Sequence, residues 1–276
     1  MDRQHHPDHH KFFEGEDHSN DYTKFRPKTP EQCIQWIVEY LSEQITKESG
    51  KFSAAADIGC GTGQCTVLLA DYFKNVHGFD VAESQINQAN RDNQYSNVSY
   101  SVSPAEQIPL PDHSLDLITC SQCFHWFDFE NFYTEVNRLL KPGGVLALIT
   151  YIRPLIVHSD NEIRNLIRNS FTSPPLNAFV DEKLKIVDNG YADVVLPFND
   201  VQRRETTVYA DGVTGSQIIG YIKSWSSYGR CVQEEPESAK RMLGDIESRI
   251  KSKTGKHVTD EQFTLETPFY VLMARK

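Results

Sequence analysis

The stretch Asp57-Ile58-Gly59-Cys60-Gly61-Thr62-Gly63 joins the apolar run Ala54–Ile58 to a segment with helical spacing, and this junction decides the fold. Glycine adopts positive φ and lets a ligand approach the backbone. A helix that starts there presents unpaired N–H groups to an anionic group, and ligands of wound α/β sheets bind at such junctions. A dinucleotide loop would read G-x-G-x-x-G, but the third glycine comes one residue early and Gln64 takes its place. The spacing therefore argues against NAD.

Short apolar runs alternate with helical patterns from Lys51 to Thr150, which is the rhythm of repeated β-α units and a parallel sheet. Right-handed crossovers would then wind the sheet. The predicted strands are Ala54–Ile58, Val76–Asp80, Val98–Val102, Leu115–Cys120 and Val145–Thr150. The predicted helices between them are Gln64–Phe73, Ala82–Arg91 and Phe129–Leu140.

Capping signals predict further helices on both sides of this block. Thr29-Pro30-Glu31-Gln32 combines an N-cap, a first-turn proline and a capping-box Gln, and predicts a helix that ends near Gly50. Beyond Thr150 the pattern changes, and this region is interpreted as an insertion. Its predicted helices begin at Ser159, Thr214 and Pro236, with a break at Pro174 and Pro175. The last run, Phe269–Ala274, predicts a strand that returns to the sheet edge.

Composition narrows the classes of function. The 276 residues suffice for one α/β domain with an insertion, and 28 basic against 38 acidic residues give a net charge of -10, so we expect no nucleic-acid partner. No run of about 18 apolar residues predicts a membrane span, and the first residues lack a secretory apolar stretch, so we expect a cytoplasmic protein without membrane partners. Cys120 and Cys123 form a C-x-x-C without a second pair, so we expect no metal.

Asp80 closes the predicted second strand about 20 residues after the glycine loop, where an acid accepts hydrogen bonds from the ribose hydroxyls of an adenosine cofactor. Loop and acid occur in the right order on the right elements. They therefore favour adenosine binding. The alternative is a plain tight turn at the glycines, with Asp80 capping the next helix.

On these motifs the sequence resembles the class I S-adenosylmethionine-dependent methyltransferases, within them the small-molecule group that includes trans-aconitate methyltransferase. The resemblance covers about Lys51 to Thr150, including the turn Leu139–Gly144. It implies an α/β fold with a doubly wound, Rossmann-like sheet of seven strands, mostly parallel with an antiparallel edge, and a helical substrate cap. It implies S-adenosylmethionine as cofactor and S-adenosylhomocysteine as product. The cofactor-binding residues that it implies are Asp57, Gly59, Cys60, Gly61, Gly63, Asp80, Val81, Ala105, Glu106, Ser121 and Gln122.

Weaker similarity to the same group extends beyond the core. His18-Ser19, Tyr22 and Phe25-Arg26-Pro27 are similar to its N-terminal lid, and Gly220–Tyr228 is similar to part of its substrate cap. We therefore expect a lid at 1–30, a cofactor-binding core at 31–150, a cap at 151–260 and a final edge strand at 261–276.

Methyl transfer from a sulfonium is an in-line displacement, so the protein mainly positions the acceptor and excludes water. A carboxylate acceptor needs no general base, whereas a phenol or amine would need one with a pKa near neutrality. His125 follows the fourth predicted strand and is the leading candidate, with Tyr22 as a second catalytic candidate. The alternative for His125 is a hydrogen bond to a loop, and both stay open.

Aromatic faces contact cations and substrates, which makes a small set of aromatic residues candidates for the pocket wall. They are Phe12, Tyr22, Trp126, Trp225 and Tyr228. Each has packing as its alternative, and the phase of Trp225 with Ile218 and Ile222 favours packing there. Arg26 and Arg153 are candidates for holding an anionic substrate bidentately, with Arg26 ranked first.

We expect the protein to methylate a small molecule, first of all on an oxygen, with a carboxylic acid as the first candidate. We expect it to be a monomer or weak homodimer. N- or S-methylation is the first alternative. A protein or nucleic-acid methyltransferase is a second, although Ser121–Phe124 stands where many amino-methylating relatives carry asparagine-proline-proline-aromatic. A noncatalytic module that has kept the cofactor fold is a third.

Overall fold

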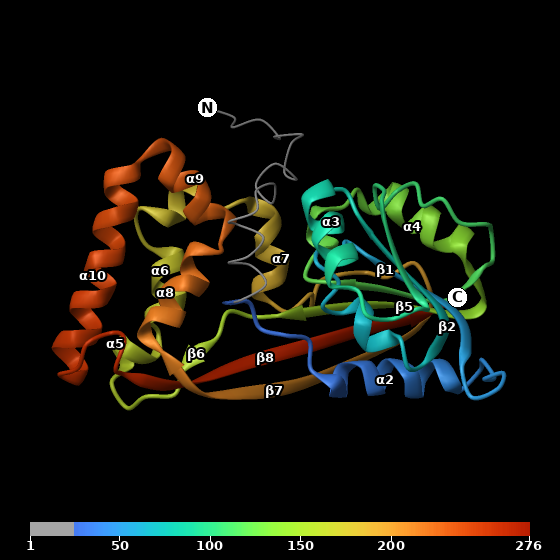
Figure 1. Ribbon diagram of the computed structural model, residues 1–276, viewed down its shortest axis with the longest axis horizontal. Coiled ribbons are helices and arrows are strands. Elements are labelled where there is room, and N and C mark those ends of the chain that lie inside the picture. The colour runs from blue at the N-terminus through green and yellow to red at the C-terminus, as the bar shows by residue number, and fades with distance from the viewer. Residues whose placement is uncertain (1–24) are drawn as a thin grey trace.

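The structure is a computed structural model that describes residues 25–276, and it is built on one mixed sheet (Figure 1). The strand order β3-β2-β1-β4-β5 is parallel throughout. These strands are β1 Phe52–Ile58, β2 Phe73–Asp80, β3 Val98–Val102, β4 Leu115–Ser121 and β5 Leu140–Tyr151. All five predicted strands are confirmed, as is the mostly parallel, Rossmann-like arrangement. The order reverses between β1 and β4, where wound sheets bind ligands.

Three antiparallel strands complete the sheet: β6 Leu155–Ile156, β7 Asp200–Thr214 and β8 Gln262–Arg275. On one side β8 pairs with β5 and then β6, and on its other side it pairs with β7 along nearly its whole length. The prediction that the last strand lies at the sheet edge is therefore wrong. Strand β7 was not predicted, because its mostly charged and polar residues show no regular apolar alternation and it lies within a segment interpreted as an insertion.

Helices cover both faces of the sheet and bury its apolar side chains. On one face α2 (Glu31–Ser42) contributes Ile34, Ile37 and Leu41 to a core beneath β1 and β5. On the other, α4 (Phe129–Leu139) contributes Phe132 and Val136. Helix α3 (Glu83–Asp92) follows β2. The α4 and α3 predictions are confirmed to within two residues at each end.

Three local predictions need correction. No α-helix forms over Gln64–Phe73, because i→i+3 bonds such as Leu68 N–H to the Cys65 carbonyl make only the 3-10 helix η2 (Thr66–Leu69) before β2 begins. Helix α2 ends at Ser42, and Pro30 rather than Thr29 is its N-cap. Asp160, not Ser159, accepts the N–H groups that begin α5.

A second, helical cluster packs beside the sheet, at the end where β7 and β8 extend beyond it (Figure 1). Its helices are α5 Asn161–Arg164, α6 Leu166–Thr172, α8 Gly215–Lys223, α9 Ser226–Glu234 and α10 Pro236–Thr254, whereas α7 (Lys185–Asp188) packs against the core of the sheet through Val187. Short 3-10 helices η3 (Phe124–Trp126), η4 (Leu176–Phe179) and η5 (Glu182–Leu184) complete the elements. The helix predicted to begin at Thr214 is confirmed as α8, and Thr214 and Gln217 form a capping box at its start. No helix within residues 25–276 has the length and apolarity that a membrane crossing requires.

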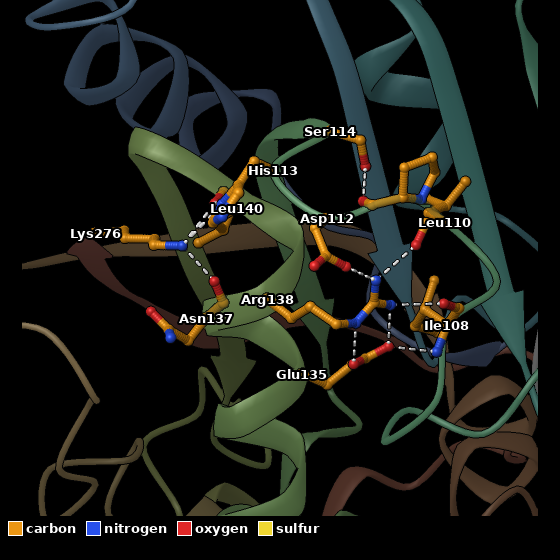
Figure 2. Close-up of polar contacts among 11 residues, drawn as sticks. Ile108, Leu110, Asp112, His113, Ser114, Glu135, Asn137, Arg138, Leu140 and Lys276 are labelled. Atoms are coloured by element: carbon orange, nitrogen blue, oxygen red, sulfur yellow. Dashed lines mark hydrogen bonds and ion pairs between the residues drawn. The ribbon is translucent and has the colours of Figure 1, made fainter.

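Arg138 of α4 ties the helix to the loop between β3 and β4 (Figure 2). Its guanidinium donates to Glu135 at 2.7 Å and 2.8 Å, to Asp112 at 2.7 Å, and to the carbonyls of Ile108 and Leu110 at 2.9 Å and 2.8 Å. Glu135 is buried and also accepts the Ile108 N–H at 2.7 Å. The arginine therefore satisfies a buried carboxylate and two loop carbonyls at once.

Substituting Arg138→Met is expected to lower the free energy of unfolding by about 2–3 kcal/mol, because it leaves Glu135 buried without its countercharge. The loss stays below that of a fully buried pair since Arg138 is 32% exposed. Urea denaturation measures it. Lys185→Met is the matched control, because it breaks an exposed pair of the same i,i+3 spacing with Glu182. Equal losses in the two variants would contradict the assignment.

Candidate functional site

The loop after β1 folds back tightly at the reversal of strand order. Gly59, Gly61 and Gly63 all have positive φ, at 70°, 56° and 84°. A Cβ at Gly59 would lie 2.6 Å from the Cys123 Sγ, and one at Gly63 would collide with the Tyr100 hydroxyl. These two positions therefore require glycine. At Gly61 the nearest atom to an added Cβ is the Gln85 Oε1 at 3.6 Å, so the backbone there is approachable.

Asp80, at the carboxyl end of β2, faces this loop. Its carboxylate accepts the Gly61 N–H at 2.9 Å and the Ala82 N–H at 2.9 Å. Burial raises the pKa of Asp80, and these N–H groups oppose the rise because they stabilise the charged form. Asp80 thus fixes the loop and also holds the turn into α3.

Asp57 is buried at the end of β1 and accepts two hydroxyl groups. The Thr66 Oγ1 lies 2.6 Å and the Thr119 Oγ1 2.8 Å from its carboxylate oxygens. Burial raises the pKa of Asp57 to about 6, against the two hydrogen bonds. These contacts join β1 to η2 and β4, so they explain why the loop keeps its shape, whereas direct contact of Asp57 with a cofactor stays a prediction.

The other predicted cofactor residues follow the carboxyl ends of β1 to β4 at the same edge of the sheet. Cys60 and Ala105 are buried, and Val81 is exposed. The Glu106 carboxylate accepts the Asp128 N–H at 2.9 Å. The Ser121 hydroxyl lies 3.1 Å from that of Thr29, so the residue expected as a helix cap contacts the end of β4 instead. Their roles toward a cofactor remain predictions.

A pocket opens where this edge meets the helical cluster, and it gathers most of the predicted substrate residues. Its lining is Arg26, Gln122, His125, Trp126, Tyr151, Arg153, Phe171, Leu184, Val187, Tyr221, Trp225 and Ser226. Trp225 both lines the pocket and packs edge-on against Phe171 and Tyr221. Tyr228 packs against the helical cluster and does not line the pocket. Phe12 and Tyr22, like His18 and Ser19, lie outside the described residues.

The two guanidinium groups of the pocket are held differently. Arg26 donates to the Ser224 hydroxyl at 3.0 Å, to its carbonyl at 2.9 Å and to the Tyr151 hydroxyl at 3.3 Å. Arg153 pairs with Asp188 and stacks 3.3 Å from the Phe171 ring centroid. Burial lowers the pKa of Arg153, against the Asp188 charge. Both candidates for anion binding therefore reach the same pocket, with Arg153 already engaged by a carboxylate.

His125 is buried in η3 at the pocket wall. Its Nδ1 lies 3.0 Å from the Tyr191 hydroxyl. Burial, with the charges of Arg26 and Lys183 adding to it, lowers the pKa of His125 to about 3. The near-neutral pKa expected of a general base is therefore not found, because the protein interior disfavours the imidazolium form.

Several pocket residues escaped the sequence analysis. Tyr151 ends β5 beside the predicted Arg153, so its place at the carboxyl end of a strand was a usable signal. Tyr191 does not line the pocket but contacts His125, which does; it has a φ of 62°, and the turn signal Asn189-Gly190 precedes it. Tyr221 and Phe171 belong to the helical cluster, and only its docking onto the sheet brings them to the pocket. Within residues 25–276, no three His, Cys, Asp or Glu side chains gather closely enough to hold a metal.

Known proteins resemble this chain in sequence and in structure. A methyltransferase-domain family model matches residues 56–148. A Dictyostelium discoideum protein described as a methyltransferase is 30% identical over 94% of this chain and 93% of its own length. A Saccharomyces cerevisiae protein described as an S-adenosylmethionine-dependent methyltransferase is 23% identical over 82% of this chain and 84% of its own. A methyltransferase structure from Anaeromyxobacter dehalogenans has a TM-score of 0.73 at 26% identity, covering 91% of this chain and 98% of that one.

The residues present fit S-adenosylmethionine. The approachable backbone at Gly61 suits the amino-acid end of the cofactor, and the half-buried Asp80 carboxylate suits its ribose hydroxyls. When bound, the cofactor supplies a methyl group activated by a sulfonium. The aromatic rings of Trp126, Tyr151 and Trp225 line the neighbouring pocket and give part of its wall an apolar surface.

Substituting Asp80→Ala is expected to weaken S-adenosylmethionine binding at least tenfold, because the loop loses its anchor at Gly61 and the ribose its acceptor. Isothermal titration calorimetry measures the Kd. Asp71→Ala, at an exposed acid in the turn before β2, is the control and should bind as the parent does. Unchanged affinity in a folded Asp80→Ala variant would contradict this reading of the loop.

The lowered pKa of His125 makes stability depend on pH. Between its ordinary value of 6.5 and the folded value of about 3, the unfolded chain takes up a proton and the folded chain does not. The contribution of the neutral His125 to the free energy of unfolding is therefore fully present above pH 6.5 and is lost as the pH falls. Between pH 7 and pH 5 the parent should lose about 2 kcal/mol more than His125→Gln. Urea denaturation at both pH values measures this, with the exposed His257→Gln as control. Parallel pH profiles for His125→Gln and the parent would refute the assignment.

Proposed function

The chain belongs to the S-adenosylmethionine-dependent methyltransferase family, and we propose that it methylates an oxygen of a small carboxylic acid. The observation that carries this proposal is the pair of guanidinium groups in one aromatic pocket. Arg26 and Arg153 both line the space beside the carboxyl end of β4. A guanidinium binds a carboxylate bidentately, which orients one oxygen of the substrate.

The protonation state of His125 supports a carboxylate acceptor over a phenol or amine. A carboxylate is already ionised at neutral pH and attacks the methyl carbon without losing a proton. His125, with its pKa lowered to about 3, is too weak a base to deprotonate a phenol or an ammonium group. Arg26 would hold the substrate, and the aromatic wall would exclude water while the oxygen lies in line with the departing sulfur.

The pocket between the sheet edge and the helical cluster also favours a small molecule over a protein segment or nucleic acid, and the net charge of -10 agrees. We propose a cytoplasmic monomer or weak homodimer. In this proposal the core of residues 31–150 binds the cofactor and residues 151–260 form the cap. Residues 1–30 act as a lid, and the final strand, within 261–276, continues the core. Within 151–260, β7 belongs to the sheet through its pairing with β8. N- or S-methylation and a noncatalytic module are the alternatives that the following experiment separates.

Incubation with methyl-labelled S-adenosylmethionine and a fractionated metabolite extract is expected to label an acidic metabolite. Mild base should release the label as volatile methanol, because carboxylate methyl esters hydrolyse whereas N-methyl, S-methyl and ether groups do not. Base-stable label would contradict the carboxylate acceptor. No label in any fraction, with the cofactor bound, would instead favour the noncatalytic module.

On the labelled acceptor, Arg26→Gln is expected to lower kcat/KM at least tenfold while the Kd for S-adenosylmethionine stays unchanged, because a charge-assisted hydrogen bond to the substrate is lost. Arg164→Gln is the matched control, since it removes the same charge from the exposed surface of α5. Equal activity of Arg26→Gln and the parent would remove Arg26 from the substrate site.

A further inference from the structure

The Tyr221 hydroxyl is a buried polar group that has no hydrogen-bond partner in the part of the chain that the structure describes. Tyr221 belongs to α8, is 3% exposed and lines the pocket. Burying a hydroxyl that makes no hydrogen bond is unfavourable, and nearly all buried polar groups of native proteins have a partner. A phenol left in this state at the wall of a pocket is explained by a ligand that supplies the missing partner.

The neighbours of this hydroxyl are polar groups of the same pocket. Burial raises the pKa of Tyr221, with Tyr151 adding to the rise and the charges of both pocket arginines opposing it. The Arg26 guanidinium carbon lies 5.6 Å from the centroid of the Tyr221 ring. The Trp225 indole packs edge-on at 5.4 Å, but an indole N–H can only donate and offers the phenol no acceptor. Tyr221 therefore keeps its proton at neutral pH and can give it to a ligand.

A second phenol of the pocket also has a proton to give. Arg26 donates to the Tyr151 hydroxyl at 3.3 Å, and a guanidinium can only donate, so the Tyr151 oxygen is the acceptor. This hydroxyl makes no other hydrogen bond among residues 25–276, so its own proton lacks an acceptor there. The Tyr151 ring packs against Phe269 at 5.3 Å between centroids, which holds it at the end of β5. The sheet and the cap thus each contribute one phenol donor to the pocket.

The lone pairs of a carboxylate match this set of donors. A carboxylate has about four lone-pair sites, of which a bidentate guanidinium fills two. Attack on the methyl carbon uses a third site, and the remaining site accepts a hydroxyl proton. An ammonium group has only protons to give, so it would find no acceptor at the two phenols and the arginines. The donors therefore suit an acceptor oxygen and disfavour an amine.

We propose that Tyr221 is a substrate-binding residue that determines specificity, its hydroxyl donating with that of Tyr151 to the carboxylate that Arg26 holds. The carboxylate in this statement rests on the proposed function. The part that belongs to Tyr221 itself is donation to an acceptor oxygen of the substrate. A site built to hydrogen-bond such an oxygen rejects a substrate that lacks it, because the buried hydroxyl is then left unpaired.

The test compares the parent with Tyr221→Phe, which removes only the hydroxyl. The probe is the metabolite fraction that the parent labels with methyl-labelled S-adenosylmethionine. When this fraction is dilute, the initial rate of methyl transfer is proportional to kcat/KM. Tyr221→Phe should lower the rate about tenfold or more, the effect of losing a hydrogen bond to a charged group. The Kd for S-adenosylmethionine, measured by isothermal titration calorimetry, should stay unchanged.

Stability separates a binding role from a structural one. Because the hydroxyl has no partner among the described residues, Tyr221→Phe should unfold at the same urea concentration as the parent or at a higher one. Tyr40→Phe is the matched control, since Tyr40 is as deeply buried but donates to the Asp200 carbonyl at 2.9 Å. It should unfold at a lower urea concentration and keep the parent's rate. A merely structural Tyr221 would behave as Tyr40 does.

Two outcomes would overturn the proposal: an unchanged rate in Tyr221→Phe, or a fall in its urea midpoint like that of Tyr40→Phe. Tyr151→Phe should lower the rate as well, because it removes the second phenol donor. Release of the label by mild base reports separately on the acceptor group. Base-stable label together with a lowered rate would refute the carboxylate and leave Tyr221 as donor to another substrate oxygen, so the two failures are distinguishable.

Discussion

The hydrogen bond from the Gly61 N–H to the Asp80 carboxylate joins the loop after β1 to the end of β2, and the site is organised around this joint. The loop can lie so close to β2 only because its glycines adopt positive φ and leave no Cβ against Tyr100 and Cys123. Asp57 stabilises the same loop by accepting hydrogen bonds from two threonine hydroxyls. The two acids therefore act differently: Asp57 is buried and holds the loop in place, whereas Asp80 is partly exposed where a ligand would bind.

The long strands β7 and β8 connect this scaffold to the pocket. They continue past the parallel sheet and place the helical cluster against its carboxyl edge (Figure 1). The pocket therefore has one wall from loops that follow β4 and β5 and another from α8 and the residues around it. In this arrangement the cofactor loop belongs to the sheet, whereas the cap forms a separate wall of the pocket. The same fold could therefore serve different acceptors, because only the wall formed by the cap must change.

Sequence patterns predicted the parallel core of the sheet but not the full lining of the pocket. The strands were predictable because each apolar run ends at a turn signal, and Asp80, which closes Val76–Asp80, has a fixed place relative to the loop. The prediction of an α-helix at Gln64–Phe73 was wrong although the segment has apolar residues at helical spacing, because i→i+3 hydrogen bonds form there. Strand β7 is long and mostly exposed, so it lacks a buried face to mark it. Tyr221 reaches the pocket, and Tyr191 reaches His125, only through tertiary packing, which no local spacing encodes.

The charges of the pocket follow from what burial does to each group. Burial costs an imidazolium its hydration, so His125 stays neutral and contributes a dipole rather than a charge. Guanidinium groups remain charged under the same conditions, because their unperturbed pKa lies far above neutrality. Positive charge in the pocket is thus confined to the arginines, one of which is already paired with Asp188. An anionic substrate, as the proposed function requires, would meet its countercharge at these arginines, whereas the neutral His125 would offer it none.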